Sequence, residues 1–447
     1  MKIARSLFLL LFLAASALAQ APGEQRARDW VRAYNSGSAE QMEAFVLANY
    51  TPEILGRRDA AGRRTMYEQL WQRHGKLTVD RIAAEGGELT LGVTPERGPA
   101  LTIRFRIEPA APHRIAGLGI DIGGGDDDGR RGPALPPLDL KKESLDDYLR
   151  KLDGFSGTVL VAKDGNVQFE KAYGPASRRY EVPNKVTTRY NLGSITKDFT
   201  KVAIGQLAQA GKLKVDAPIG TYLPNYPNKE IAQKVTVQQL IDHTSGLGDI
   251  FTPRFFQRNP MQFTTLQHFI DFFAAEPLKF EPGKGEAYSN YGYIVLGAII
   301  EALSGENYFD YIQKHVFDPV KMTGSGFFDL REPVGDLATG HTNRDGVWRE
   351  NTTARPSPRG IPAGGSYSSA RDLLLFDRAL RAKKLLNDEW TRWWFGGDPD
   401  TDGTWAGGSP GVNASISSNG TWTVVVLTNL DPPLAEKLSP QIFRALR

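Results

Sequence analysis

The first residues with catalytic potential are a serine and a lysine three positions apart. Ser194 and Lys197 stand in YNLGSITKDFTKVAIGQLAQAGKL, residues 190–213, whose apolar positions predict a helix beginning near the serine. Positions i and i+3 are neighbours on one face of an α-helix, so the hydroxyl and the amine can approach each other. A serine needs a base to become a nucleophile, and burial of a lysine favours the neutral amine that can act as one. Because Ser-x-x-Lys is a common pattern, the spacing alone leaves a solvated helix face as the competing interpretation.

A second candidate pair is a tyrosine and an asparagine separated by one residue. Tyr288 and Asn290 stand in KFEPGKGEAYSNYGYIVLGAIIEALSG, between a Pro-Gly loop and a strongly apolar helix pattern. A phenol can pass protons, and an amide can hold a substrate carbonyl, so the two side chains could serve one cleft. Tyr226 and Asn228 have the same spacing, but they lie in the Pro-rich loop YLPNYPN, and we interpret them as structural.

A third candidate is the glycine-rich segment WAGGSPGVNA, residues 405–414. Its residues Gly407 to Gly411 match the G-x-S-x-G pattern of a nucleophile elbow. An elbow joins a strand to a helix and uses the N–H of the residue after the serine, but Pro410 has no N–H and a strand pattern follows. The segment is instead predicted to be a bare strand edge against which a substrate backbone can lie.

The elements that must position these residues belong to a domain predicted over residues 138–447. Two strand patterns flank Asp164-Gly165, and two more flank Asn419-Gly420, which are both hairpin signals. Helix and loop patterns fill the stretch from 191 to about 395, and residues 433–447 read as a helix. A sheet built from both ends of the domain, with helices between them, gives an α+β fold.

A smaller α+β domain is predicted over residues 22–122. A helix pattern covers residues 28–50, and strand patterns cover residues 76–85, 88–95, 100–109 and 112–122. The segment resembles a small curved-sheet domain of the NTF2-like type. It contains no catalytic constellation, so we expect an accessory domain for packing or dimerisation, and the oligomeric state stays open. Residues 123–137, GGGDDDGRRGPALPP, have the composition of a linker.

The N-terminal residues and the overall composition limit where the protein acts and what it binds. Residues 1–21 combine Lys2 and Arg5, an apolar run from Leu7 to Leu13 and a small-x-small cleavage signal, which predicts a signal peptide rather than a membrane anchor. The chain has 447 residues and no cysteine, which suits the bacterial periplasm or secretion without disulfides. Lys plus Arg exceed Asp plus Glu by 54 − 51 = 3, a balance that suggests neither nucleic acid nor an anionic membrane as a partner. Stable membrane insertion is not expected either.

Taken together, NLGSITK, YSN and the glycine-rich strand resemble, in that order, the serine β-lactamase and penicillin-binding-protein-like superfamily, specifically its class C β-lactamase and esterase branch. LIDHTSGLGD at 240–249, GGSYSSARDLLLFDRAL at 364–380 and TWTVVVLTN at 421–429 extend the resemblance over roughly residues 150–430. It implies an antiparallel sheet flanked by helices, with a helical subdomain. It also implies that Ser194 is acylated, that Lys197 helps to deprotonate it, that Tyr288 shuttles the proton and that Asn290 binds substrate. The N–H groups of Ser194 and Gly408 would form the oxyanion hole, beside Gly407, and no metal or cofactor is implied.

One position departs from the family pattern. Trp405 stands where the family usually has Lys or His, and an indole has one donor and no charge with which to attract a substrate carboxylate. Three interpretations follow: the substrate lacks a carboxylate, another cation such as Arg359 or Arg371 serves, or the site is inactive and used for binding.

The histidines are interpreted as structural. His243 and His341 lie in segments that would pack near the site, and six histidines without a close pair argue against zinc.

The function expected from the sequence is therefore that of an exported serine hydrolase. It would cleave an ester or amide of a small molecule or peptide, in the manner of an esterase, a D-aminopeptidase or a carboxypeptidase, rather than preferentially a β-lactam. The alternative is an inactive binding or scaffold protein that has the same fold.

Overall fold

The computed structural model describes residues 23–55, 60–85, 88–97, 101–122, 135–344, 347–351 and 356–447. The predicted signal peptide, residues 1–21, lies outside the described residues, as does most of the predicted linker. The chain divides into two compact units between residues 130 and 131, a point within that linker. Within the described residues no helix has both the length and the apolar character needed to cross a membrane.

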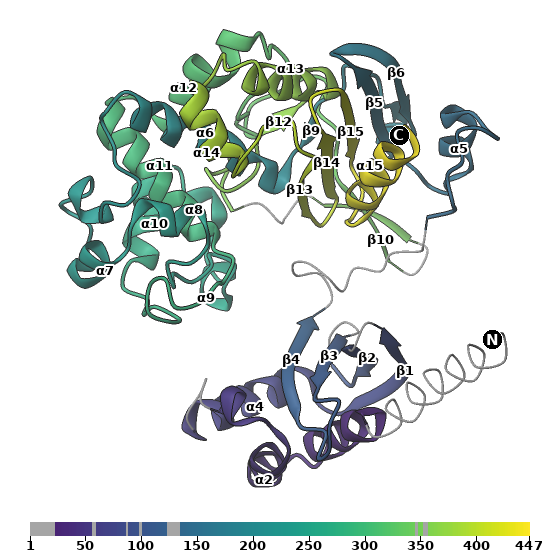
Figure 1. Ribbon diagram of the computed structural model, residues 1–447, viewed down its shortest axis with the longest axis vertical. Coiled ribbons are helices and arrows are strands. Elements are labelled where there is room, and N and C mark those ends of the chain that lie inside the picture. Colours follow the sequence, from purple (N-terminus) through teal and green to yellow (C-terminus); the bar gives the residue numbers. More distant parts are fainter. Residues whose placement is uncertain are drawn as a thin grey trace, which may run out of the picture. The chain divides into compact units, whose positions relative to one another are not determined.

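The N-terminal unit is a four-stranded antiparallel sheet with helices on it (Figure 1). The strands pair in chain order, β1 (Leu77–Glu85), β2 (Glu88–Pro95), β3 (Leu101–Ile107) and β4 (Ile115–Ile122). The helices are an unlabelled one over residues 23–34, α2 (Ala39–Asn49), α3 (Pro52–Leu55) and α4 (Ala60–His74). The α+β class expected for this unit is confirmed, whereas the NTF2-like resemblance stays a prediction.

The single helix predicted over residues 28–50 is two helices. Gly37 has a φ of 71°, which is left-handed and ends the first helix. Ser38 then caps α2, because its side chain accepts a hydrogen bond from the N–H of Gln41. The turn lets both helices lay their apolar residues on one face of the sheet.

The C-terminal unit is built on a five-stranded antiparallel sheet with strand order β13-β14-β15-β5-β6 (Figure 1). The strands come from both ends of the unit, as predicted: β5 (Gly157–Lys163) and β6 (Asn166–Tyr173) from the start, β13 (Gly403–Ser409), β14 (Val412–Ser418) and β15 (Trp422–Thr428) from the end. The predicted hairpin at Asp164-Gly165 is confirmed, since Lys163 pairs with Asn166 and both turn residues have positive φ.

Both faces of this sheet are covered, so its central strands are apolar on both sides. Val159 and Val161 of β5 pack on α5 (Leu145–Lys151) and α15 (Leu434–Ala445). Leu160 and Ala162 belong to the larger core on the other face, with α6 (Thr196–Gln209) and α13 (Ala370–Arg381). The alternation follows from the two-residue period of a strand.

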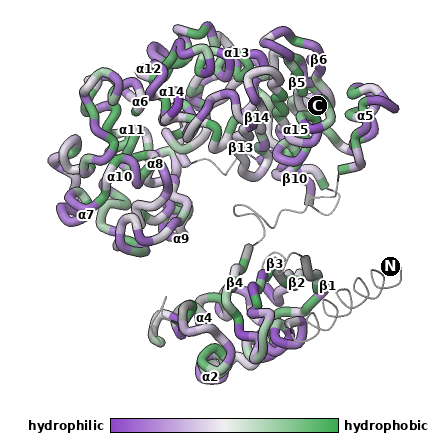
Figure 2. Tube along the Cα trace, in the orientation of Figure 1, coloured by the Kyte–Doolittle hydropathy of each residue, from purple (hydrophilic) through white to green (hydrophobic). Residues whose placement is uncertain are grey.

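A helical region lies between the two halves of the sheet in sequence. It contains α7 (Lys229–Lys234), α8 (Val237–Ile241), α9 (Pro253–Phe256), α10 (Leu266–Phe273), α11 (Asn290–Ser304), α12 (Tyr308–Ile312) and, after α13, α14 (Asp388–Phe395). The first eleven residues of α11 are buried, which explains why it is apolar all round (Figure 2). Short strand pairs complete the unit: β7 (Pro175–Ser177) with β8 (Val182–Pro183), β9 (Tyr190–Asn191) with β12 (Tyr367–Ser368), and β10 (His341–Arg344) with β11 (Val347–Glu350).

Candidate active site

Ser194 lies in a tight turn that leads directly into a buried helix. Residues Gly193–Ile195 form a 3-10 turn, and α6 follows from Thr196. Gly193 has a φ of 53°, and its N–H donates to Asn191 Oδ1 at 2.9 Å. Thr196 Oγ1 donates to the Gly193 carbonyl at 2.8 Å. These local bonds, with the packing of α6, fix the backbone on which the serine sits.

Lys197 is buried one turn beyond the serine and contacts three acceptors. Its side chain is only 6% exposed, and Nζ lies 3.2 Å from Ser194 Oγ, 2.8 Å from Asn290 Oδ1 and 2.6 Å from the Ala363 carbonyl oxygen. The carbonyl and the amide oxygen are acceptors only. In a neutral amine they take its two N–H bonds, which leaves the lone pair for the proton of Ser194. The predicted pair is therefore brought together in a geometry that suits a base.

Tyr288 reaches the same serine from the loop before α11. Its hydroxyl lies 2.6 Å from Ser194 Oγ, and its side chain is 38% exposed. Lys197 Nζ lies 4.7 Å from the centre of the tyrosine ring. The phenol thus stands at the solvent side of the nucleophile, where a leaving group would depart.

Asn290, the first residue of α11, is held by both of its amide atoms. Oδ1 accepts from Lys197, while Nδ2 donates to the two carboxylate oxygens of Asp249 at 3.0 and 3.1 Å. Ser289 caps the helix by accepting from the N–H of Gly292 at 2.9 Å. The structure shows Asn290 orienting Lys197, and its expected contact with substrate stays a prediction.

His243 supports Tyr288 from the side. The two ring centres are 4.4 Å apart, and His243 Nδ1 accepts from the N–H of Ser289 at 3.2 Å. Burial, and secondarily the charge of Lys197, lowers the pKa of His243 to about 4. The ring is therefore neutral over the pH range of most enzymes, in agreement with the structural role expected from the sequence. Burial also raises the pKa of Asp198, the residue after Lys197, to about 7, against the opposing effects of Lys201 and Lys197.

Strand β13 passes directly against the backbone of the nucleophile. A Cβ atom on Gly407 would lie 2.1 Å from the Leu192 carbonyl oxygen and 2.6 Å from the Ser194 nitrogen, and one on Gly193 would lie 2.7 Å from the Gly408 nitrogen. Only glycine permits this approach, which brings together the two backbone N–H groups expected to hold an oxyanion.

The ring of Trp405 points away from the nucleophile. Trp405 shares the face of β13 that carries Gly407, but its ring packs on Trp394 and Phe395 of α14, with ring centres 5.6 and 5.9 Å away. A Cβ atom on Gly403 would lie 3.2 Å from the outer carbons of the indole, so the ring leans toward the start of the strand. Trp405 therefore neither carries a charge into the site nor stands over Ser194.

The two other cations considered from the sequence lie elsewhere. Arg371 on α13 forms an ion pair with Glu170 of β6, with 2.6 Å between Nη2 and Oε2. Arg359 donates to the Phe327 carbonyl at 2.9 Å and lies over the ring of Phe309. Both guanidinium groups thus have partners outside the proposed site, and the idea that one of them replaces a basic residue at position 405 stays a prediction.

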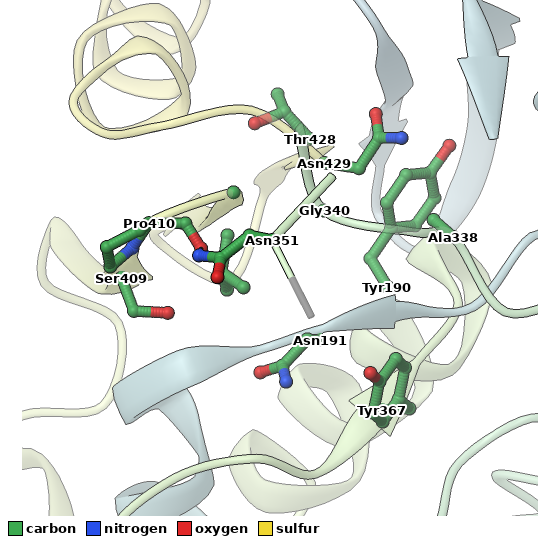
Figure 3. Close-up of a pocket in the computed structure, with 12 residues that line it drawn as sticks. Tyr190, Asn191, Ala338, Gly340, Asn351, Tyr367, Ser409, Pro410, Thr428 and Asn429 are labelled. Atoms are coloured by element: carbon green, nitrogen blue, oxygen red, sulfur yellow. The ribbon is translucent and has the colours of Figure 1, made fainter. Parts of the chain in front are cut away.

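A small pocket lies behind the nucleophile segment, at the turn between β13 and β14 (Figure 3). Its volume is about 30 Å³, and its lining includes Asn191, Tyr367, Ser409 and Asn429. That volume suits water rather than a substrate.

The Tyr226 segment, the Gly407 to Gly411 segment and His341 pack as their interpretation as structural predicted. Tyr226 is buried with its hydroxyl 2.9 Å from that of Tyr291, and Asn228 caps α7. Ser409 ends one strand and Gly411 turns into the next, so Gly407 to Gly411 form a hairpin and no elbow. His341 is buried, with Nε2 accepting from the N–H of Arg178 at 3.2 Å. In the part of the chain that the structure describes, no group of three or more acidic or histidine side chains is placed to hold a metal.

Comparisons with known proteins identify the family to which the chain belongs. The family model described as Beta-lactamase matches residues 145–446, which is more than half of the chain. Penicillin-binding protein 4* of Bacillus subtilis (strain 168) is 32% identical over 256 residues, covering 53% of this chain and 55% of that protein. The chain spans 60% and 55% of the lengths of the first two curated relatives it matches.

Solved structures extend the likeness. A penicillin-binding protein from Bacillus halodurans is 29% identical and superposes with a TM-score of 0.59. The match covers 66% of this chain and 97% of that protein's chain. A D-amino acid amidase from Ochrobactrum anthropi shares the fold, with a TM-score of 0.56 at 20% identity, over 68% of this chain and 96% of its own. The chain belongs to the β-lactamase family, and its C-terminal unit has the fold of the β-lactamase and penicillin-binding-protein type.

Sequence reasoning missed two contributors to the site. Asp249 holds Asn290, and the Ala363 carbonyl holds Lys197. Both lie in stretches that support the family resemblance, 240–249 and the neighbourhood of 364–380, but no residue-level signal marked either one. Their roles arise from contacts between segments far apart in sequence.

Proposed function

We propose that this protein hydrolyses an ester or amide whose recognition does not depend on a substrate carboxylate, through an acyl-enzyme on Ser194. The observation that carries the proposal is the double contact at Ser194 Oγ, with Lys197 Nζ at 3.2 Å and the Tyr288 hydroxyl at 2.6 Å, beside a strand whose residue 405 is an uncharged, turned-away tryptophan.

The reaction proceeds in two halves. The neutral amine of Lys197 takes the proton of Ser194 as Oγ attacks the substrate carbonyl carbon. The N–H groups of Ser194 and Gly408 bind the resulting oxyanion, a contribution of about 2.7–4 kcal/mol per donor in such holes. As the bond to the leaving group breaks, Tyr288 gives its proton to that group and is reprotonated from Lys197. Water then attacks the acyl-enzyme, and the same proton transfers run in reverse. The ester bond to Ser194 breaks and the carboxylic acid product leaves.

Residue 405 defines the class of substrate. A lysine at that position would place a charge near the carbonyl being attacked and favour penicillins or peptides ending in a free carboxylate. Trp405 provides none, and Arg359 and Arg371 are engaged elsewhere. Esters and amides without that carboxylate do not need a positive charge at residue 405 in order to bind, which supports an esterase-like or amidase-like activity. D-amino acid amidases and a hydrolase with acyltransferase activity are among the proteins of the same fold.

A comparison of two chromogenic substrates tests this proposal. We expect p-nitrophenyl butyrate to be hydrolysed by the wild type and not by Ser194→Ala, and a chromogenic cephalosporin to have a kcat/KM at least about 100-fold lower. Equal rates on both substrates would contradict the substrate class. Absence of Ser194-dependent turnover of either would favour the alternative, a binding protein that has the hydrolase fold.

We also propose that the enzyme acts after export, in the periplasm or outside the cell. The composition of residues 1–21 supports this. N-terminal sequencing of the chain recovered from a periplasmic extract tests it: a start at about residue 20 or 22 is expected, and an intact residue 1 in the cytoplasm would contradict it.

A further inference from the structure

The N-terminal unit contains a cavity of about 270 Å³ that the proposed hydrolysis does not use. It lies between the helices and the sheet, with walls from the helix over residues 23–34, from α2, from α4 and from β4. The wall residues include Trp30, Tyr34, Met42, Val46, Tyr67 and Leu118.

The aromatic walls are fixed by contacts with one another. Trp30 and Tyr34 stack with ring centres 5.5 Å apart and planes 14° apart, and Tyr34 meets Tyr67 edge to face at 5.6 Å. The Tyr67 hydroxyl donates to the Tyr34 carbonyl at 3.0 Å. All three residues are almost wholly buried. Because these rings hold their positions through each other, the cavity is a preformed feature of the fold, as ligand sites usually are.

The charged groups at the cavity are paired: Arg63 with Glu43, and Arg64, which also lines the cavity, with Glu40 at 3.6 Å. The Arg63 guanidinium meets the Glu43 carboxylate, with Nε 3.1 Å from each oxygen, and Nη1 donates to the Leu55 carbonyl at 3.1 Å. Both side chains are more than four-fifths buried. A charged ligand that entered the cavity would have to disrupt the Arg63–Glu43 pair and leave one partner buried without its counter-charge, which is costly. The cavity therefore favours an uncharged ligand.

One polar group is suited to orient such a ligand. The Tyr50 hydroxyl accepts from the Trp30 indole N–H at 3.0 Å. Within the described residues, no acceptor for the proton of that hydroxyl is present. Burial raises the pKa of Tyr50, so the phenol stays protonated and remains a donor. A ligand with one acceptor atom near Tyr50 would satisfy it.

We propose that the N-terminal unit binds an uncharged, mainly apolar molecule about the size of two fused aromatic rings, with one hydrogen-bond acceptor directed at Tyr50. The size follows from the volume, because an apolar cavity of about 150 Å³ accommodates a benzene molecule and this one is nearly twice as large. The unit is then a small-molecule binding module joined to a hydrolase.

Calorimetric titration of the full chain with three probes tests the proposal. Quinoline has two fused rings and one acceptor, naphthalene lacks the acceptor, and 2-naphthoate adds a negative charge. We expect saturable binding of one quinoline per chain, about fivefold weaker binding of naphthalene, as one hydrogen bond implies, and no measurable binding of 2-naphthoate. Equal binding of 2-naphthoate and quinoline would overturn the uncharged class.

Two neighbouring residues on α2 provide matched variants. Val46→Trp fills the cavity and should abolish quinoline binding, whereas Leu47→Trp adds the same side chain at an exposed position and should not. Ser194→Ala should bind quinoline as the wild type does, which separates this site from the hydrolase. Absence of binding to the wild type, or binding that persists in Val46→Trp, would overturn the proposal, whatever the hydrolase activity proves to be.

Discussion

The Tyr288 hydroxyl lies 2.6 Å from Ser194 Oγ, closer than Lys197 Nζ, which lies 3.2 Å from the same oxygen. The two groups come from different elements: Lys197 from the buried face of α6 and Tyr288 from the exposed loop before α11. They approach the nucleophile from two sides, so one can withdraw the serine proton while the other delivers a proton to the leaving group. Their contributions should therefore respond differently to the substrate.

Replacing Tyr288 by Phe should slow amide cleavage more than cleavage of an activated ester. An amine must be protonated as it leaves, but p-nitrophenolate leaves as a stable anion. We expect kcat/KM to fall about 100-fold or more on a p-nitroanilide and less than about 10-fold on a p-nitrophenyl ester. The phenyl ring keeps the contact with His243, so the fold is retained.

Lys197→Ala is the contrasting variant. It removes the base and should lower kcat/KM on both substrates by about 100-fold to 10,000-fold. Equal losses on the two substrates in Tyr288→Phe would contradict the separation of roles.

Gly407→Ala should inactivate the enzyme without unfolding it. The new methyl group would meet the Leu192 carbonyl and the Ser194 nitrogen at distances that force β13 away from the nucleophile. We expect kcat to fall by about 100-fold to 1,000-fold, the loss typical of one oxyanion donor. Gly335→Ala is the control, because no atom lies within 4 Å of its Cβ position. A wild-type kcat in Gly407→Ala would contradict the close approach of β13 to the backbone of Ser194.

Trp405→Lys should create a preference for substrates with a carboxylate, such as penicillin, that the wild type lacks. An ammonium on this face of β13 would supply the charge that attracts a carboxylate, so we expect acylation by penicillin to accelerate about 10-fold or more. Trp405→Phe removes the indole without adding charge and should leave penicillin acylation as it is in the wild type. Loss of the ring from its contacts with Trp394 and Phe395 should lower the thermal midpoint in both variants. Unchanged acylation in a folded Trp405→Lys protein would show that residue 405 does not set the substrate class.

His243 should contribute a free energy of unfolding that decreases as the pH falls from about 6.5 to about 4, while Asp198, whose pKa burial raises to about 7, contributes in the opposite direction. The pKa of His243 is about 4 when folded against an ordinary 6.5, so in this window the residue binds more protons in the unfolded chain than in the folded one. Burial lowers the pKa of His341 as well, which adds in the same direction. Urea unfolding at several pH values measures the slope. His243→Gln should make the change in the free energy of unfolding with rising pH less positive than in the wild type. A slope identical in His243→Gln and the wild type would contradict the role of His243.

Features governed by short-range rules were predictable from the sequence. Asp164-Gly165 and Asn419-Gly420 predict hairpins because these residue types accept the backbone angles of a tight turn, and both hairpins are present. The spacing of Ser194 and Lys197 predicts their proximity because helical geometry is fixed. The family resemblance placed Tyr288 beside them, and the structure does the same.

Features that depend on tertiary contacts could not be predicted from the sequence alone. The direction of the Trp405 ring depends on Trp394 and Phe395, which a separate helix brings to the strand. Asp249 reaches Asn290 across 41 positions of chain. The break in the first predicted helix depends on Gly37 adopting a left-handed angle, although the Ser-Gly-Ser sequence around it was a local signal for a turn.

The most direct test of a serine nucleophile activated by Lys197 and Tyr288 is the intact mass of the protein after incubation with a fluorophosphonate. A parallel incubation with a penicillin completes it. We predict one phosphonyl group on the wild type, none on Ser194→Ala, and little or no penicilloyl adduct on either. A phosphonyl adduct that persists in Ser194→Ala, or a wild type that takes up no phosphonyl group, would contradict the account.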